Sequence, residues 1–120
     1  MNNDIEITIE ELKGKIRRFI IERNWEKYHN PKDLAEAICI EAAELLELFQ
    51  WRSINEVQEL MKNEEFIEKI AEEIADIVIY SLSLINVIKI DLTEAIMKKL
   101  KKNEEKYPIE KYFGKAHIDE

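Results

Sequence analysis

Two pairs of acidic residues give the strongest chemical signal in this sequence. Glu41 and Glu44 are three residues apart, and Glu73 and Asp76 repeat that spacing further along the chain. In an α-helix, residues i and i+3 lie on the same face, so each pair presents two neighbouring carboxylates. Carboxylate oxygens are hard ligands that suit Mg²⁺ or Mn²⁺. If the two helices pack together, the spacing predicts a divalent-metal site.

The placement of these acids on their helices distinguishes them from ordinary surface residues. On a helical wheel, Glu41 falls inside the apolar arc of its helix, and Glu44 lies at the border of that arc. Glu73 lies at the edge of the apolar stripe of its own helix, with Asp76 and Tyr80 on the same strip. A buried carboxylate must be neutralised or compensated by a cation. The alternative is that all four acids are solvated or paired with Lys and Arg.

Three further residues near the C-terminus form a polar strip beside an apolar line. Lys99, Asn103 and Tyr107 follow an i, i+4, i+8 spacing. Lys99 could bind a phosphate, and Asn103 a sugar, a base or a phosphate. The alternative is a lysine that extends to solvent and an asparagine near a helix end.

Aromatic residues and a histidine flank the helix that carries the first acidic pair. Trp25 and His29 precede this helix, and Trp51 follows it. The tryptophans could stack on a base or cover the ends of a helical bundle. A di-iron or di-manganese carboxylate centre is disfavoured, because it needs Glu-x-x-His on two helices and the only example is Glu26 to His29.

The elements that must position these residues are helices. Four helix starts have capping residues: Thr8 with Glu11, Asn30 before Pro31, Ser53 with Glu56, and Asp91 with Glu94. We expect helices over Ile9–Glu22, Pro31–Gln50 and Leu92–Lys106, and a short helix from Ile54 that leads into a long helix ending near Lys89. The prediction is an all-α, four-helix bundle forming a single domain over residues 1–120, with an irregular tail over 108–120.

Composition excludes several other classes of protein. Hydrophobic residues make up 46% and charged residues 37%, with only 2 Gly and 2 Pro, which disfavours disorder and many-stranded sandwiches. The net charge of −8, without a basic block, argues against binding a nucleic-acid polymer. The single cysteine, Cys39, excludes an intramolecular disulfide and a multi-cysteine zinc site. No segment resembles a signal peptide or a membrane span, so the expected location is the cytoplasm.

The long helix also predicts a homo-oligomer. From Ile74 onward, apolar residues occupy nearly all directions of the wheel, including Ile79 and Val87. A four-helix protomer covers only part of such a helix, so a second chain is expected to cover the rest. The prediction is a homodimer or homotetramer.

Several segments together resemble a known family. The chain is similar to the all-α nucleoside triphosphate pyrophosphohydrolases of the MazG-like superfamily, and most similar to their dCTP pyrophosphatase branch. The matching segments are Arg23-Asn24-Trp25, Tyr28-His29-Asn30-Pro31-Lys32, Glu41-Ala-Ala-Glu44-Leu, Phe49-Gln50-Trp51, Glu73-Ile-Ala-Asp76-Ile-Val-Ile-Tyr80, and Lys99 through Asn103 to Lys106-Tyr107-Pro108. Asn24 stands where that branch has Asp.

The resemblance implies a Mg²⁺-dependent hydrolysis of a (d)NTP, with a dCTP-like substrate favoured, to the monophosphate and pyrophosphate. It implies that the catalytic and metal-binding residues are Glu41, Glu44, Glu73 and Asp76. It further implies that Lys99 and Tyr107 bind phosphate, and that the nucleoside side is formed by Trp25, His29, Trp51, Tyr80 and Asn103. The alternatives are a phosphoribosyl-ATP pyrophosphatase and a non-enzymatic acidic helical assembly module.

Overall fold

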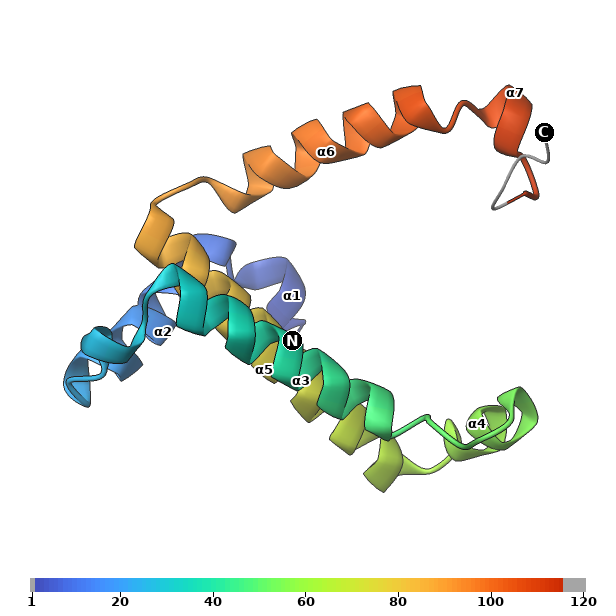
Figure 1. The fold of residues 1–120 in the computed structure, drawn as a ribbon, viewed down its shortest axis with the longest axis horizontal. Coiled ribbons are helices and arrows are strands. Elements are labelled where there is room, and N and C mark those ends of the chain that lie inside the picture. The colour runs from blue at the N-terminus through green and yellow to red at the C-terminus, as the bar shows by residue number, and fades with distance from the viewer. Residues whose placement is uncertain (1, 116–120) are drawn as a thin grey trace. The chain divides into compact units, whose positions relative to one another are not determined.

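The protein is described by a computed structural model that covers residues 2–115 (Figure 1). Its helices are α1 (Asn3–Glu6), α2 (Ile9–Glu22), α3 (Pro31–Glu47), α4 (Ile54–Leu60), α5 (Glu64–Ile88), α6 (Leu92–Lys106) and α7 (Ile109–Tyr112), with a 3-10 turn at Glu26–Tyr28. No strand occurs in this part of the chain, which confirms the predicted all-α class. Within the same residues, no helix has both the length and the apolar character needed to span a bilayer.

The helix starts lie where the capping residues predict them. Each capping side chain accepts a hydrogen bond from the third backbone N–H that follows it, which satisfies one otherwise unpaired donor of the first turn. These bonds join Thr8 to Glu11 (3.1 Å), Asn30 to Asp33 (2.9 Å), Ser53 to Glu56 (3.1 Å) and Asp91 to Glu94 (2.9 Å). The bounds of α2 and α6 agree with the prediction at both ends.

The structure differs from the prediction at other helix boundaries. Helix α3 ends at Glu47 and a turn follows, so the helix is shorter than the predicted Pro31–Gln50. Asn63 separates α4 from α5, because its Oδ1 accepts the N–H of Phe66 at 3.1 Å and caps a new helix. The single turns α1 and α7 were not predicted, and α7 lies inside the expected irregular tail. Residues 116–120 of that tail lie outside the described residues.

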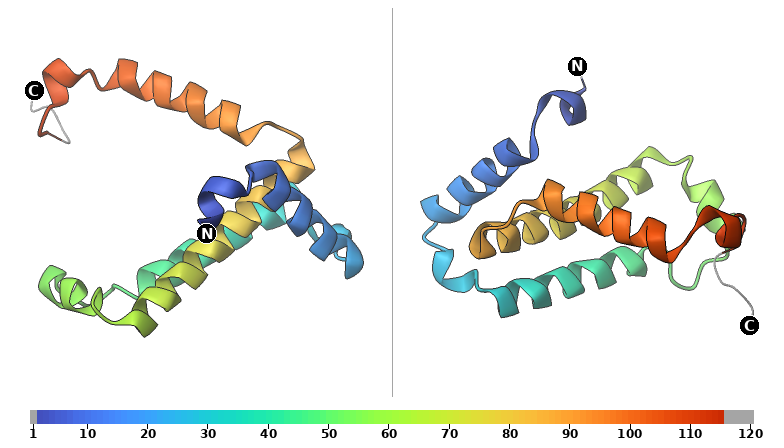
Figure 2. Two further views of the ribbon diagram at one scale, coloured as in Figure 1. Left: turned by 180° about the vertical axis from the view of Figure 1, so that it is seen from behind. Right: turned by 90° about the horizontal axis from the view of Figure 1, so that it is seen from above.

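Helices α3 and α5 form the central pair of the first part of the chain. They lie side by side and run in opposite directions, with α4 in the connection between them (Figures 1 and 2). Leu34 near the start of α3 is buried, as are Leu82 and Ile85 near the end of α5. At the other end of the pair, the ring of buried Phe66 packs edge-on against Phe49 at 5.9 Å. Burial of each such side chain contributes about 1.5–3 kcal/mol to stability.

Helix α2 packs against α5 through one buried residue and a polar link. Ile20 supplies the apolar contact. The Arg17 guanidinium donates to Asn86 Oδ1 at 2.9 Å, and Asn86 Nδ2 donates to the Lys13 carbonyl at 3.1 Å. Asn86 thus uses both ends of its amide, which fixes α2 to the C-terminal half of α5.

The described chain divides into two compact units, one that ends at Lys89 and one that begins at Ile90. Lys89 takes a left-handed conformation (φ 58°) and ends α5, with its N–H bonded to the Ile85 carbonyl. The second unit contains α6 and α7, and the rings of Tyr107 and Tyr112 pack edge to face at 5.0 Å. The predicted four-helix bundle and single domain stay predictions.

Candidate active site

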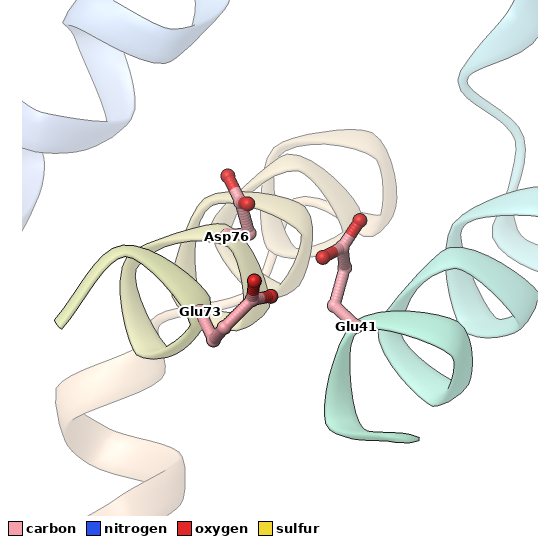
Figure 3. A group of neighbouring side chains, drawn as sticks. All are labelled: Glu41, Glu73 and Asp76. Carbon is pink, nitrogen blue, oxygen red and sulfur yellow. The ribbon is translucent and has the colours of Figure 1, made fainter. Parts of the chain in front are cut away.

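Helices α3 and α5 bring three carboxylates together. Glu41 projects from α3, and Glu73 and Asp76 project from α5 toward the same space (Figure 3). One oxygen of each residue lies within 4.8 Å of the corresponding oxygens of the other two. Glu41 and Glu73 are half-buried, whereas Asp76 is exposed. The antiparallel packing of α3 on α5 therefore produces the convergence that the two sequence spacings predict.

Glu44 is the fourth member of this acidic cluster. It lies one turn after Glu41 on α3 and interacts with the carboxylates of both Glu41 and Glu73. All four predicted acids, Glu41, Glu44, Glu73 and Asp76, thus lie in one neighbourhood. We refer to them below as the acidic cluster.

The negative charges of the acidic cluster repel one another. Burial, followed by the interaction with the neighbouring Glu44 carboxyl group, raises the pKa of Glu41 from its ordinary value of 4.5 to about 7. Burial and the neighbouring Glu44 charge also raise the pKa of Glu73. Among the described residues, no Lys, Arg or His forms an ion pair with any of the four acids. A cation would remove this repulsion.

The donor atoms fit a hard divalent cation. Glu41 Oε2 and Glu73 Oε2 are buried and have no hydrogen-bond partner among the described residues. The converging group consists of carboxylates and contains neither His nor Cys. Such an all-oxygen set is typical of Mg²⁺ or Mn²⁺ rather than Zn²⁺. The residues present therefore fit the metal that the sequence predicts.

A cavity of about 510 Å³ adjoins the acidic cluster, with Asp76 in both. Three of the predicted nucleoside-side residues line it: Trp25, His29 and Tyr80. The rest of its wall is formed by Lys15, Ile16, Phe19, Ile20, Ile79 and Ser83. A mostly apolar cavity with aromatic walls beside a carboxylate cluster suits a ligand that has a flat ring and an anionic, metal-bound end.

The aromatic wall of the cavity is held by local contacts around Trp25. The Trp25 ring packs edge-on against Phe19 at 5.8 Å, and the Arg23 guanidinium covers Phe19 at 3.7 Å. His29 Nδ1 lies 2.8 Å from the Trp25 carbonyl oxygen. Asn24 adopts a left-handed conformation (φ 55°), which asparagine tolerates better than most residues. This conformation is compatible with Asn24 in place of the Asp found in the dCTP pyrophosphatase branch.

Trp51 is placed very differently from Trp25. Its side chain is 94% exposed, and its backbone is left-handed (φ 67°), which is unfavourable for a bulky residue. The neighbouring Arg52 side chain donates to the Leu48 carbonyl at 3.0 Å and lies over the buried Phe66 ring. These contacts hold the turn after α3 and leave the Trp51 ring in solvent within the single chain.

The remaining predicted residues belong to the second unit. Lys99 and Asn103 lie on α6, where Asn103 is half-buried and Lys99 is exposed. Tyr107 ends α6, and its N–H bonds to the Asn103 carbonyl at 2.8 Å. Their contribution to the acidic cluster or to the cavity stays a prediction.

Sequence reasoning missed several residues that line the cavity. Lys15 and Phe19 on α2 and Ser83 on α5 carried no recognisable motif. For Ser83 a signal was available, because it follows Asp76 by seven residues, which is two helical turns on the same face. Lys15 and Phe19 depend on how α2 packs on α5, which no local spacing encodes.

Comparisons with known proteins place the chain in a family. A model of the MazG-like family matches residues 37–117. The chain is 33% identical over 111 residues to dCTP pyrophosphatase 1 of Mus musculus, covering 92% of this chain and 65% of that protein. It is 33% identical over 103 residues to dCTP pyrophosphatase 1 of Homo sapiens, covering 86% of this chain and 61% of that protein. A crystal structure of a pyrophosphatase from Archaeoglobus fulgidus is 49% identical, with a TM-score of 0.76, and the match covers 82% of this chain and 91% of that one.

Proposed function

Because this chain belongs to the MazG-like family, we propose that it is a Mg²⁺-dependent nucleoside triphosphate pyrophosphohydrolase that favours a dCTP-like substrate. The proposed reaction cleaves the bond between the α- and β-phosphates and releases a monophosphate and pyrophosphate. Support comes from relatives named as dCTP pyrophosphatases and from a solved relative described as a pyrophosphatase. The chain spans 65% of the length of the mouse relative, so activity and substrate are proposed here rather than transferred.

The observation that carries the proposal is the shared position of Asp76. This residue contributes an oxygen to the acidic cluster and also lines the aromatic cavity. A nucleotide with its triphosphate at the cluster can therefore extend its base into the cavity beside Trp25 and Tyr80. A panel of dNTPs and NTPs, assayed for pyrophosphate with and without Mg²⁺, tests this directly. The proposal would be refuted if the protein released pyrophosphate from none of these nucleotides.

The acidic cluster would hold the metal through Glu41, Glu44, Glu73 and Asp76. Mg²⁺ bound there would neutralise the triphosphate and make an attacking water more acidic. An acid of the cluster that is not fully used in metal binding can accept the proton from that water. A metal also explains how a protein with a net charge of −8 binds a polyanion, since it reverses the local sign of charge.

The other side chains would position the nucleotide. Trp25 and Tyr80 would hold the base, with His29 near its polar edge. Lys99 and Tyr107 would contact the phosphates, and Asn103 the nucleoside. A phosphoribosyl-ATP pyrophosphatase is the second candidate, but the two curated relatives above are both named dCTP pyrophosphatases. A non-enzymatic assembly module would show no Mg²⁺-dependent release of pyrophosphate.

Mg²⁺ should stabilise the protein more at pH 8 than at pH 6. The pKa of Glu41 is raised to about 7 without metal, so the folded state holds its proton more tightly than the unfolded state. The stability from this proton is fully present below pH 4.5 and is lost as the pH rises through about 7. Above that pH, the ionised carboxylate gains most from a bound cation.

Thermal unfolding with and without MgCl₂ at the two pH values measures this effect. In Glu41→Gln, the side chain at position 41 no longer titrates. The rise in Tm that Mg²⁺ produces should therefore differ less between pH 6 and pH 8 than it does in the wild-type protein. An equal rise in Tm at pH 6 and pH 8 in the wild-type protein would contradict a metal site that includes Glu41.

Trp51→Ala should weaken binding of a nonhydrolysable dNTP by about 1–3 kcal/mol, if Trp51 stacks on the base. The substitution should leave stability nearly unchanged, because the Trp51 ring is exposed in the single chain. Tryptophan fluorescence, titrated with the nucleotide in the presence of Mg²⁺, measures the affinity of the wild-type protein, and calorimetry measures that of the variant. Trp51→Phe keeps an aromatic face and should lose less. An equal loss for tripolyphosphate, which has no base, would rule out the base contact.

A further inference from the structure

Ser83 is a buried polar residue that the proposed mechanism does not use. Its residue exposure is 2%, and its Oγ has no hydrogen-bond partner within residues 2–115. A serine inside a helix often donates to the carbonyl four residues earlier, as Ser81 does to Ile77 at 2.7 Å. An unsatisfied buried hydroxyl costs about 1–3 kcal/mol. The described residues therefore provide no hydrogen-bond partner for the Ser83 hydroxyl.

The position of Ser83 along α5 relates it to the acidic cluster. Asp76, Tyr80 and Ser83 follow an i, i+4, i+7 spacing, and all three line the same cavity. Seven residues of helix correspond to about 10 Å along the axis. If the triphosphate lies at the acidic cluster, Ser83 is at the end of the cavity wall that faces the base. Helix α5 thus places a carboxylate of the acidic cluster, an aromatic ring and a hydroxyl along one wall of the cavity.

His29 provides a second polar group in this cavity. Its Nδ1 lies 2.8 Å from the Trp25 carbonyl oxygen, which can only accept a hydrogen bond. The neutral ring therefore carries its proton on Nδ1, and Nε2 is an acceptor. His29 and Ser83 also both line a second, neighbouring cavity of about 260 Å³, so the two side chains lie at the boundary between the cavities. The cavity thus offers an acceptor and a hydroxyl in an otherwise mainly apolar wall.

We propose that the Ser83 hydroxyl hydrogen-bonds the base of the bound nucleotide and, with His29 Nε2, selects a base that has an exocyclic amino group next to an unprotonated ring nitrogen. His29 Nε2 would accept from the amino group, and the Ser83 hydroxyl would donate to the ring nitrogen. Cytosine and adenine present this edge. Uracil and thymine place a carbonyl oxygen where His29 needs a donor. This inference rests on the proposed function and adds the residue that determines base specificity.

The test compares dCTP with dUTP, which have similar shapes and differ at this edge. The wild-type protein should prefer dCTP, and Ser83→Ala should lower the ratio of kcat/KM for dCTP to that for dUTP by about 2- to 10-fold, the worth of one hydrogen bond. Ser83→Cys, which nearly preserves volume, should show the same loss. Stability should stay constant or increase in Ser83→Ala, because alanine leaves no unsatisfied hydroxyl.

Ser81→Ala is the matched control, since its hydroxyl is already bonded within the helix. In Ser81→Ala, the ratio of kcat/KM for dCTP to that for dUTP should equal the ratio in the wild-type protein. The inference is overturned if the wild-type protein does not prefer dCTP to dUTP, if Ser83→Ala leaves the ratio unchanged, or if Ser81→Ala reduces it equally. If the wild-type protein releases pyrophosphate from no nucleotide, the proposed function itself has failed, which is a different result.

Discussion

Glu41→Gln and Asp76→Asn should each lower the rate of pyrophosphate release by about 10²–10⁴-fold, the range that positioned acid–base groups contribute. The two residues come from different helices and contribute oxygens to the same group. Each amide keeps the shape of the acid but loses its negative charge, so metal binding and proton transfer both suffer. Pyrophosphate release at saturating Mg²⁺ measures the loss.

The same variants should fold normally. Each removes one negative charge from a cluster whose members repel one another, so the free energy of unfolding should stay constant or increase. Glu72→Gln is the matched control, because Glu72 is an exposed neighbour of Glu73 on α5. It makes the same chemical change outside the cluster and should retain full activity. Near-wild-type activity in Glu41→Gln or Asp76→Asn would remove the acidic cluster from the mechanism.

Local features of the sequence are sufficient to predict most of the helix framework. A cap such as Thr8 or Asp91 satisfies backbone donors within its own first turn, so its effect does not depend on tertiary packing. The sequence also predicts a short helix from Ile54 followed by a long one, but it does not locate the boundary between them, which lies at the capping residue Asn63.

The acidic cluster could also be predicted, because its members occur at a regular spacing on two helices. Their placement near apolar stripes required the two helices to lie against each other, and α3 and α5 do so. The wall of the cavity could not be predicted in the same way. Lys15 and Phe19 reach it only because α2 packs on α5, an arrangement fixed by contacts such as that between Arg17 and Asn86. Those two residues are 69 positions apart in the chain, and neither signals its partner.

The apolar surface of α5 bears on the state of assembly. Few apolar side chains are buried in the single chain, and many on α5 are not. Val78 is 44% exposed and Ile79 is 43% exposed. Val87, which the sequence also predicts to lack cover, is 39% exposed. Several exposed apolar side chains on one helix are consistent with an interface between chains. We therefore expect a homodimer or homotetramer in which α5 packs against a second chain.

Ile79→Glu should lower the oligomer order and the activity together. A charge placed in an apolar interface loses its hydration without gaining a partner, which costs several kcal/mol. Ile79 also lines the cavity, so activity alone would not separate the two effects. Val78→Glu provides that separation, because Val78 is equally exposed but is not among the described residues that line the cavity. Val78→Glu should dissociate the oligomer as strongly as Ile79→Glu does.

Light scattering after gel filtration at micromolar concentration measures the mass of each species. Ile79→Ala is the control for volume, since it shortens the side chain without adding charge, and it should retain most of the assembly. An active wild-type species with the mass of one 14.3 kDa chain would contradict the prediction. In that case, the exposed side chains of α5 would have to be covered within the chain itself. Full burial of an exposed side chain of this size contributes about 1.5–3 kcal/mol. Because Val78, Ile79 and Val87 are already more than half buried, a partner chain would add roughly half of that value for each of them.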